Sequence, residues 1–216
     1  MKSRTRTPDP QPYHHGNLRR ALLAEALASL RTEGAENLSL RALARALGVS
    51  QAAPYRHFAD KESLLAELAA QGFRELGHDM RVVMDSPDLP PAAAMQAAGV
   101  SYIRFAARHP ELYRLMFGTC RVDRTRYAGL DEAAADAFSA LLAAIQRGVD
   151  SGNFRDEPVM VMAMAAWSIV HGFASLAIDG QLSAAGVTDD CALAEQVTRL
   201  LRVGVEIERE ARPPQR

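Results

Sequence analysis

Residues 38–61 read Leu-Ser-Leu-Arg-Ala-Leu-Ala-Arg-Ala-Leu-Gly-Val-Ser-Gln-Ala-Ala-Pro-Tyr-Arg-His-Phe-Ala-Asp-Lys, and this stretch decides the fold of the N-terminal part of the chain. Gly48 can supply the positive φ of a tight turn, and Ser50 can cap a helix over 51–57. Ser39 can cap the preceding helix, whose inward residues are Leu40, Leu43, Ala44 and Leu47. Two short helices joined by a glycine-containing turn are the outline of a DNA-binding helix-turn-helix.

The sequence on both sides of this stretch also has helical periodicity. Apolar residues repeat at helical spacing over 18–30, and Gly34 is expected to end that helix. Asp60 can cap a long helix that runs to about Met84, and the turn-forming residues 85–91 follow it. Further helices are expected near 92–108, 111–118, 125–151, 157–179 and 190–210. No alternating strand pattern is visible, so the fold class is all-α.

Composition supports a folded, helical chain with a basic beginning. Of the 216 residues, 48% are hydrophobic and 24% charged, as in soluble globular proteins, and aromatic residues make up only 6%. Residues 1–61 carry a net charge of +5, whereas residues 62–216 carry −6. This asymmetry favours an N-terminal part that faces nucleic acid, although solvated arginines would give the same pattern.

Residues 38–61 resemble the TetR family of bacterial transcriptional regulators, and the likeness extends from about His15 to Phe73. The segment His109–Phe117 and the spacing Trp167…His171-Gly172 resemble the subgroup named for a Trp-His-Gly motif. The family resemblance implies a homodimer that places its third helix in the major groove of a palindromic double-stranded DNA operator. It also implies a C-terminal domain that binds a small-molecule effector, whose identity the sequence does not give.

The resemblance assigns DNA contacts to the second and third helices. The residues carried over are Ser39, Arg41, Gln51, Ala52, Ala53, Tyr55, His57 and Lys61. Independently of the family, Arg41 and Gln51 have the two-point geometry that reads guanine and adenine, although both could simply be solvated. His57, beside Phe58, could equally close the small core. Pro54 departs from the family pattern and is expected to change the tilt of the reading helix.

The expected domain organisation has four parts. Residues 1–14 form a disordered basic arm, 15–75 the DNA-binding domain with its motif at about 38–58, 76–210 the ligand-binding and dimerisation domain, and 211–216 a tail. The neighbouring His14 and His15 lack a third ligand at coordination spacing, so no metal site is expected there. The two cysteines, Cys120 and Cys191, form no metal or redox motif, which fits a reducing cytoplasm.

The largely apolar segment 159–178 has 20 residues, which is long enough to span a membrane. Acidic flanks and the lack of a Lys/Arg cluster favour a buried helix of a soluble domain instead, so no membrane partner is expected. Its small or polar interruptions are Ser168, His171, Gly172 and Ser175, a stripe expected where helices pack closely or line a cavity. The expected ligand-binding residues are Tyr102, Phe105, Phe117, Phe138, Trp167 and His171, although each could be ordinary core.

These observations together predict a ligand-responsive, dimeric DNA-binding regulator. A repressor released from its operator by a small, mainly apolar effector is the expected form, and the sequence itself does not distinguish repression from activation. The alternatives are a helical-bundle enzyme with a basic N-terminal adaptor and an architectural DNA-binding protein without a ligand. The chain has no glycine-rich phosphate loop, no nucleophile motif and no His/Glu spacing for a metal. No catalytic residue, cofactor or metal is therefore expected.

Overall fold

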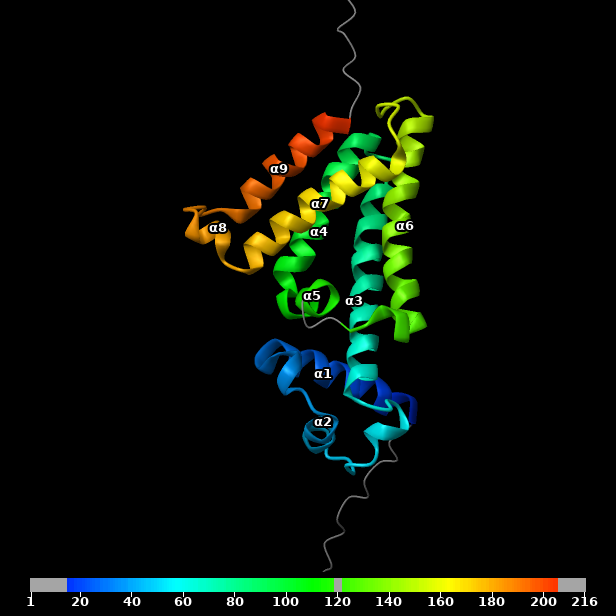
Figure 1. Cartoon of the computed structure of the whole chain (residues 1–216), viewed down its shortest axis with the longest axis vertical. Coiled ribbons are helices and arrows are strands. Elements are labelled where there is room, and N and C mark those ends of the chain that lie inside the picture. The colour runs from blue at the N-terminus through cyan, green and yellow to red at the C-terminus, as the bar shows by residue number, and fades with distance from the viewer. Residues whose placement is uncertain (1–14, 119–121, 206–216) are drawn as a thin grey trace, which may run out of the picture. The chain divides into compact units, whose positions relative to one another are not determined.

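A computed structural model describes residues 15–118 and 122–205, and within these ranges the chain is helical without a β-strand (Figure 1). The all-α expectation is therefore confirmed. The chain divides into two compact units, residues 1–64 and 65–216. The elements are α1 (His15–Asn37), α2 (Leu40–Ala46), η1 (Pro54–Arg56), α3 (Lys61–Met84), α4 (Pro91–Arg108), α5 (Pro110–Phe117), η2 (Arg124–Arg126), α6 (Ala128–Asp150), α7 (Val159–Ile178), α8 (Gln181–Ala184) and α9 (Asp190–Val205). The predicted arm and tail lie outside the described residues.

The first unit is a small helical domain whose turns form as the sequence predicts. The Ser39 hydroxyl accepts the N–H of Ala42 at 3.2 Å and so caps α2, and Gly48 has the expected positive φ of 66°. Gly34 interrupts α1 as expected, with the non-helical angles φ 75° and ψ 168°, and a second short helical segment continues from it to Asn37. The core of the unit consists of Leu18, Leu22, Leu23, Ala26, Leu30, Leu38, Leu40, Leu43, Ala44, Pro54, Phe58 and Leu64.

The prediction of an α-helix over 51–57 is wrong in detail, because the chain there forms turns and the short 3₁₀ helix η1. Pro54 has no N–H, so it cannot donate to the Ser50 carbonyl as an α-helix requires. That carbonyl instead accepts the N–H of Ala53 at 2.9 Å, and the N–H of His57 bonds to the Pro54 carbonyl at 2.9 Å. These three-residue spacings are the pattern of a 3₁₀ helix.

Helix α3 begins at a reciprocal cap. The Asp60 carboxylate accepts the N–H of Ser63 at 2.7 Å, and the Ser63 hydroxyl accepts the N–H of Asp60 at 3.2 Å. The helix then continues to Met84, as predicted. The boundary between the two units falls after Leu64, whereas the sequence suggested residues 75 and 76, and both positions lie within α3.

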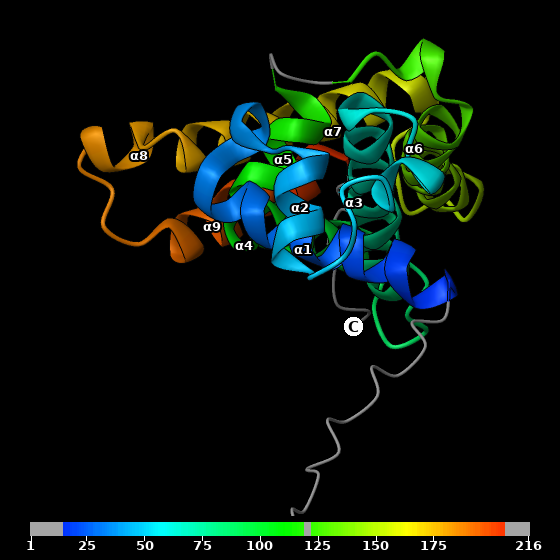
Figure 2. The ribbon, with the colours of Figure 1, turned by 90° about the horizontal axis from the view of Figure 1, so that it is seen from below.

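The second unit is a helical bundle organised around α4, which packs against both α7 and α9. Helix α6 packs on α7, and the short α8 turns the chain from α7 into α9 on the side away from α6 (Figures 1 and 2). Small residues let α3 approach α6: a Cβ added at Gly77 would lie 3.2 Å from the Ala137 Cα. The ion pair between Arg81 and Asp136, at 3.0 Å, spans the same two helices.

Helix α7 has one buried and one exposed apolar face. It is the one helix of the described residues that has the length and apolar character to cross a membrane. Its buried face, which packs within the unit, contains Met162, Ala163, Ala166, Val170, Phe173 and Ala174. Ser168 is exposed, and a Cβ added at Gly172 would have no neighbour within 4 Å. The predicted stripe is therefore divided, since only His171 and Ser175 reach polar partners inside the unit.

Candidate functional site

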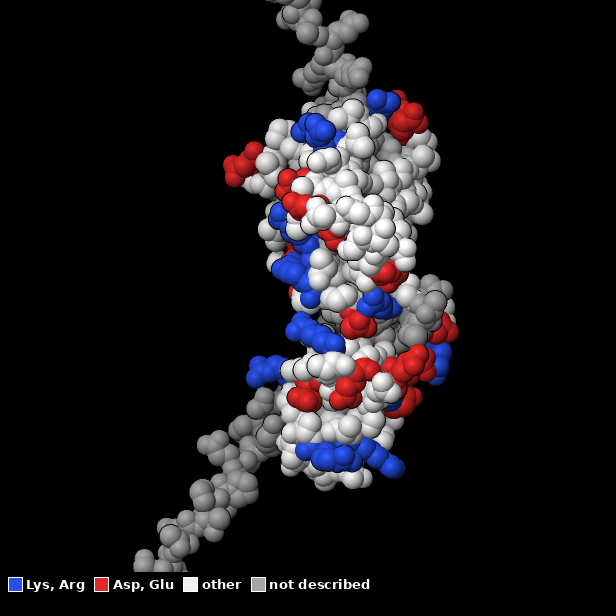
Figure 3. Space-filling view, turned by 90° about the vertical axis from the view of Figure 1, so that its left-hand side faces the viewer, with Lys and Arg blue, Asp and Glu red and all other residues white. Residues whose placement is uncertain are grey.

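The first unit exposes basic side chains along α2. Arg41 is exposed, and so is Arg45, one turn later on the same face of the helix. Figure 3 shows Lys and Arg side chains gathered at the level of α2 and η1. The sequence interpretation singled out Arg41 but missed Arg45, which the four-residue spacing could have indicated. Two guanidinium groups on one exposed helix face suit contacts with phosphates and guanine edges.

The predicted contact residues that follow α2 lie mostly on the surface. Gln51 and Ala52 are exposed, Ala53 is half-buried, and the Tyr55 ring is 47% exposed. Tyr55 is the central residue of η1, and a hydroxyl on an exposed tyrosine is suited to donate to a phosphate oxygen. Arg56 is also exposed in this turn and was not among the predicted residues.

His57 and Lys61 have contacts within the first unit. The Nε2 atom of His57 is buried and has no hydrogen-bond partner among the described residues, and the ring is half-buried. This placement agrees with the alternative in which His57 helps to close the core. The Lys61 ammonium donates to the Glu36 carbonyl at 2.5 Å, near the end of α1. Lys61 therefore holds α1 to the start of α3, whatever else it contacts.

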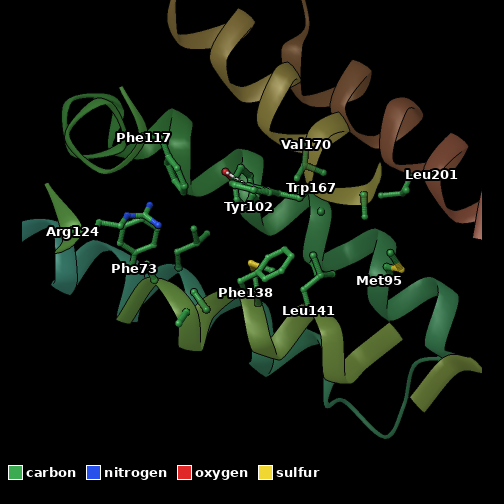
Figure 4. A pocket seen from close by; sticks show the side chains of 18 of the residues that line it. Phe73, Met95, Tyr102, Phe117, Arg124, Phe138, Leu141, Trp167, Val170 and Leu201 are labelled. Carbon is green, nitrogen blue, oxygen red and sulfur yellow. Dashed lines mark hydrogen bonds between the residues drawn. The ribbon is translucent and has the colours of Figure 1, made fainter. Parts of the chain in front are cut away.

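The second unit contains a largely apolar cavity of about 290 Å³ (Figure 4). Four of the predicted ligand residues line it: Tyr102 of α4, Phe117 of α5, Phe138 of α6 and Trp167 of α7. The other lining residues are Phe73, Leu76, Met80, Met95, Ala98, Gly99, Arg124, Asp131, Ala134, Ala135, Ala137, Leu141, Ala166, Val170 and Leu201. A concave apolar space with a few polar groups is the usual form of a small-molecule site.

Four aromatic or imidazole side chains form a hydrogen-bonded chain at the cavity wall. The Trp167 Nε1–H donates to the Tyr102 hydroxyl at 3.3 Å. The Tyr102 and Tyr113 hydroxyls are 3.0 Å apart, and the Tyr113 hydroxyl lies 2.6 Å from Nδ1 of His171. The indole N–H and both hydroxyl donors are used when Trp167 donates to Tyr102, Tyr102 to Tyr113 and Tyr113 to His171. The chain joins α4, α5 and α7, so it fixes three helices around the cavity.

Burial keeps this hydrogen-bonded chain uncharged. It raises the pKa of Tyr102 to about 12 and raises the pKa of Tyr113 further. Burial also lowers the pKa of His171 below its usual 6.5, because the imidazolium form would lose its hydration. A neutral imidazole has one unprotonated ring nitrogen, and Nδ1 serves as that acceptor for Tyr113.

The six predicted ligand residues fall into two groups: four line the cavity and two do not. Tyr102, Phe117, Phe138 and Trp167 come together at the cavity, and His171 lies directly behind them, 3.0 Å from the Tyr102 hydroxyl. Phe105 does not line the cavity. Its ring is fully buried and lies 5.2 Å from the His109 ring, near the end of α4.

Sequence reasoning also missed residues that line the cavity. Phe73, Leu76 and Met80 belong to α3, a helix for which the sequence predicted no ligand-binding residue. Arg124 lies in η2, and its guanidinium stands 4.5 Å over the Phe73 ring. No periodic signal marks a residue of an irregular connection, so Arg124 could not be found from helical spacing.

The chain belongs to the TetR family of bacterial transcriptional regulators. Residues 22–68 match the family model "Bacterial regulatory proteins, tetR family", and residues 95–201 match "Tetracyclin repressor-like, C-terminal domain". The two matches cover the helix-turn-helix and most of the cavity-bearing unit. The protein is therefore a DNA-binding transcriptional regulator. The resemblance to the Trp-His-Gly subgroup stays a prediction.

Similarity to individual proteins supports the same family assignment. The HTH-type transcriptional regulator Rv1816 of Mycobacterium tuberculosis is 26% identical over 200 residues, which cover 78% of this chain and 83% of that protein. A Rhodococcus sp. RHA1 protein of unknown function is 31% identical, with a TM-score of 0.81 over 92% of this chain and 100% of the other. The TetR family regulator PfmR of Thermus thermophilus has 24% identity and a TM-score of 0.65, covering 86% and 99% of the two chains, and shows the shared fold.

Proposed function

We propose that this regulator is a cytoplasmic, non-enzymatic repressor that leaves its palindromic operator when a small, mainly apolar effector fills the cavity of the second unit. The observation that carries the proposal is the aromatic-lined cavity of about 290 Å³ in a chain whose other unit is a helix-turn-helix. A DNA-reading unit joined to a ligand-sized cavity is the arrangement that effector-controlled repression requires.

A homodimer is part of the proposal, because α7 and α9 expose apolar side chains that nothing in the described chain covers. Val161 is 60% exposed and Leu200 is 69% exposed, on two helices that pack side by side. The other large exposed side chains of this apolar face are Met160, Met164, Ile169, Leu176 and Val203. A contiguous apolar face on two adjacent helices suits a second copy related by a two-fold axis. The two copies would form a four-helix interface.

Helix α3 offers a route from the cavity to the DNA-reading unit. Phe73, Leu76 and Met80 line the cavity, and the same helix begins at Lys61, whose ammonium is bonded to the end of α1. An effector that presses on α3 in the cavity would therefore act on a helix whose first turn belongs to the first unit. Coupling requires that the effector prefer the dimer geometry that cannot span both half-sites, since equal affinity for both states shifts nothing.

The proposal is tested by binding of the purified protein to its own promoter region. Fluorescence anisotropy of a labelled promoter fragment should give tight, saturable binding that an unlabelled copy displaces. A random fragment of the same length should displace it only at a concentration at least about 1,000-fold higher. Equal competition by promoter and random DNA would contradict sequence-specific regulation at that site. It would favour an architectural role instead.

A further inference from the structure

The two ends of the cavity differ in chemistry. Figure 4 shows Arg124 and Phe73 at one end, and Met95 and Leu201 at the other, with the aromatic side chains between them. Two charged residues line the cavity, Arg124 and Asp131, and the rest of the wall is mainly aliphatic and aromatic. A molecule that fills this space would therefore meet apolar surface along its body and charge at one end.

Arg124 is built into the wall as an anion-binding group. Its guanidinium stands 4.5 Å over the Phe73 ring, and Phe73 itself is buried. A guanidinium group is planar, and its N–H groups lie in that plane as a rigid fork. That planar fork matches a carboxylate with two parallel hydrogen bonds. The aromatic ring therefore fixes the orientation of a group suited to carboxylates.

Asp131, the other charged residue that lines the cavity, is explained by its place in α6 and not by a ligand. It is exposed and lies in the first turn of α6, where the helix dipole favours a negative side chain. Exposure also screens its charge from a ligand in the cavity. The uncharged polar groups of the wall are engaged with one another, because the Tyr102 hydroxyl already pairs with Trp167, Tyr113 and His171.

We infer that the cavity takes an amphipathic carboxylate, with its apolar body between Phe138, Trp167 and Met95 and its carboxylate at Arg124. The inference rests on the proposed effector role of the cavity and names the chemical class of that effector. At about 30 Å³ for a group the size of water, 290 Å³ accommodates about ten or more non-hydrogen atoms. A medium-length alkyl or aryl-alkyl carboxylate fits this size.

The chain carries its own probe for the experiment, because Trp167 is its single tryptophan and lines the cavity. Trp167 fluorescence of the full-length protein is titrated with decanoate, 1-decanol and decylamine, all below the concentrations at which they aggregate. Decanoate should bind at least about tenfold more tightly than decanol, and decylamine should bind least. Arg124→Gln should bring decanoate to the level of decanol and leave decanol unchanged.

Arg126→Gln is the matched control, because Arg126 lies in the same 3₁₀ helix and is exposed without lining the cavity. It should leave the preference for decanoate intact, and circular dichroism should show both variants folded. Equal affinity for decanoate and decanol, tightest binding of decylamine, equal weakening of both ligands by Arg124→Gln, or no response to any of the three probes would overturn the inference. Promoter binding by the same preparation without ligand tests the regulator function separately.

Discussion

The two units of this protein use polar side chains in opposite ways. In the first unit the candidate binding groups are exposed, as Arg41 and Gln51 are, and need only a scaffold that holds the backbone. In the second unit the polar groups are buried and bonded to one another, as Tyr113 and His171 are at 2.6 Å. The difference indicates that substitutions in the first unit should change DNA affinity with little effect on stability. Substitutions in the buried chain should change stability and ligand response together.

The largest effect is expected from a charge on the exposed apolar face of α7. Val161→Asp would place two like charges near each other across a two-fold interface, at a cost of several kcal/mol. Size-exclusion chromatography with light scattering should show a monomer, and promoter affinity should fall at least about 100-fold. Val82→Asp is the matched control, because Val82 of α3 is also 60% exposed and lies on a different helix. A dimeric Val161→Asp protein would place the interface elsewhere.

The next largest effect on promoter affinity is expected from the loss of a base-reading arginine. Arg41→Ala is expected to cost about 1–3 kcal/mol at the operator and to relax the preference at one base pair, while thermal stability stays the same. Anisotropy titrations against operator variants and random DNA measure both effects. Equal losses on operator and random DNA would reduce Arg41 to a phosphate contact. Arg45→Ala shows whether the neighbouring guanidinium shares the role.

The buried chain of the second unit should respond to pH. Because burial lowers the pKa of His171 in the folded state, the unfolded state binds more protons as the pH falls below about 6.5. His171 therefore leaves stability intact above that pH and reduces it as the pH falls toward the lower folded pKa, by at most about 1.4 kcal/mol per pH unit. Urea unfolding should show that His171→Gln removes this part of the decline, whereas His78→Gln, at an exposed histidine, retains it. The same pH dependence in wild type and His171→Gln would argue against the assignment.

The smallest expected effect concerns Lys61. If its ammonium also meets phosphate, Lys61→Ala should weaken binding to all DNA sequences alike and flatten the salt dependence by about one unit of slope. If the bond to the Glu36 carbonyl is its whole role, the slope should stay the same and the melting temperature should fall. Promoter titrations at several salt concentrations distinguish the two outcomes.

Local signals in the sequence were enough to predict most of the helices. Ser39 and Asp60 form the expected caps, and Gly48 takes the expected positive φ, because each depends only on its near neighbours. The turn at Pro54 was harder to predict: a change of tilt was expected, but the actual result, a 3₁₀ helix in place of an α-helix, depends on how the carbonyls of Ser50 and Pro54 are satisfied.

The site in the second unit shows the limit of sequence reasoning more clearly. Helical spacing and residue type selected Trp167 and Tyr102, both of which line the cavity. The same criteria selected Phe105, which faces another part of the core. The pairing of Tyr113 with His171, 58 residues apart, depends on how α5 meets α7 and has no local signal. The position of Arg124 over Phe73 depends in the same way on tertiary structure.

The central claim is that occupancy of the cavity controls DNA binding, and one titration tests it most directly. Decanoate is added to the protein bound to a labelled promoter fragment, while Trp167 fluorescence reports the cavity and anisotropy reports the DNA. We predict that the two signals change together and that saturating decanoate weakens promoter affinity about 5- to 150-fold, with DNA weakening decanoate binding by the same factor. A cavity that fills while promoter affinity stays constant would contradict the account.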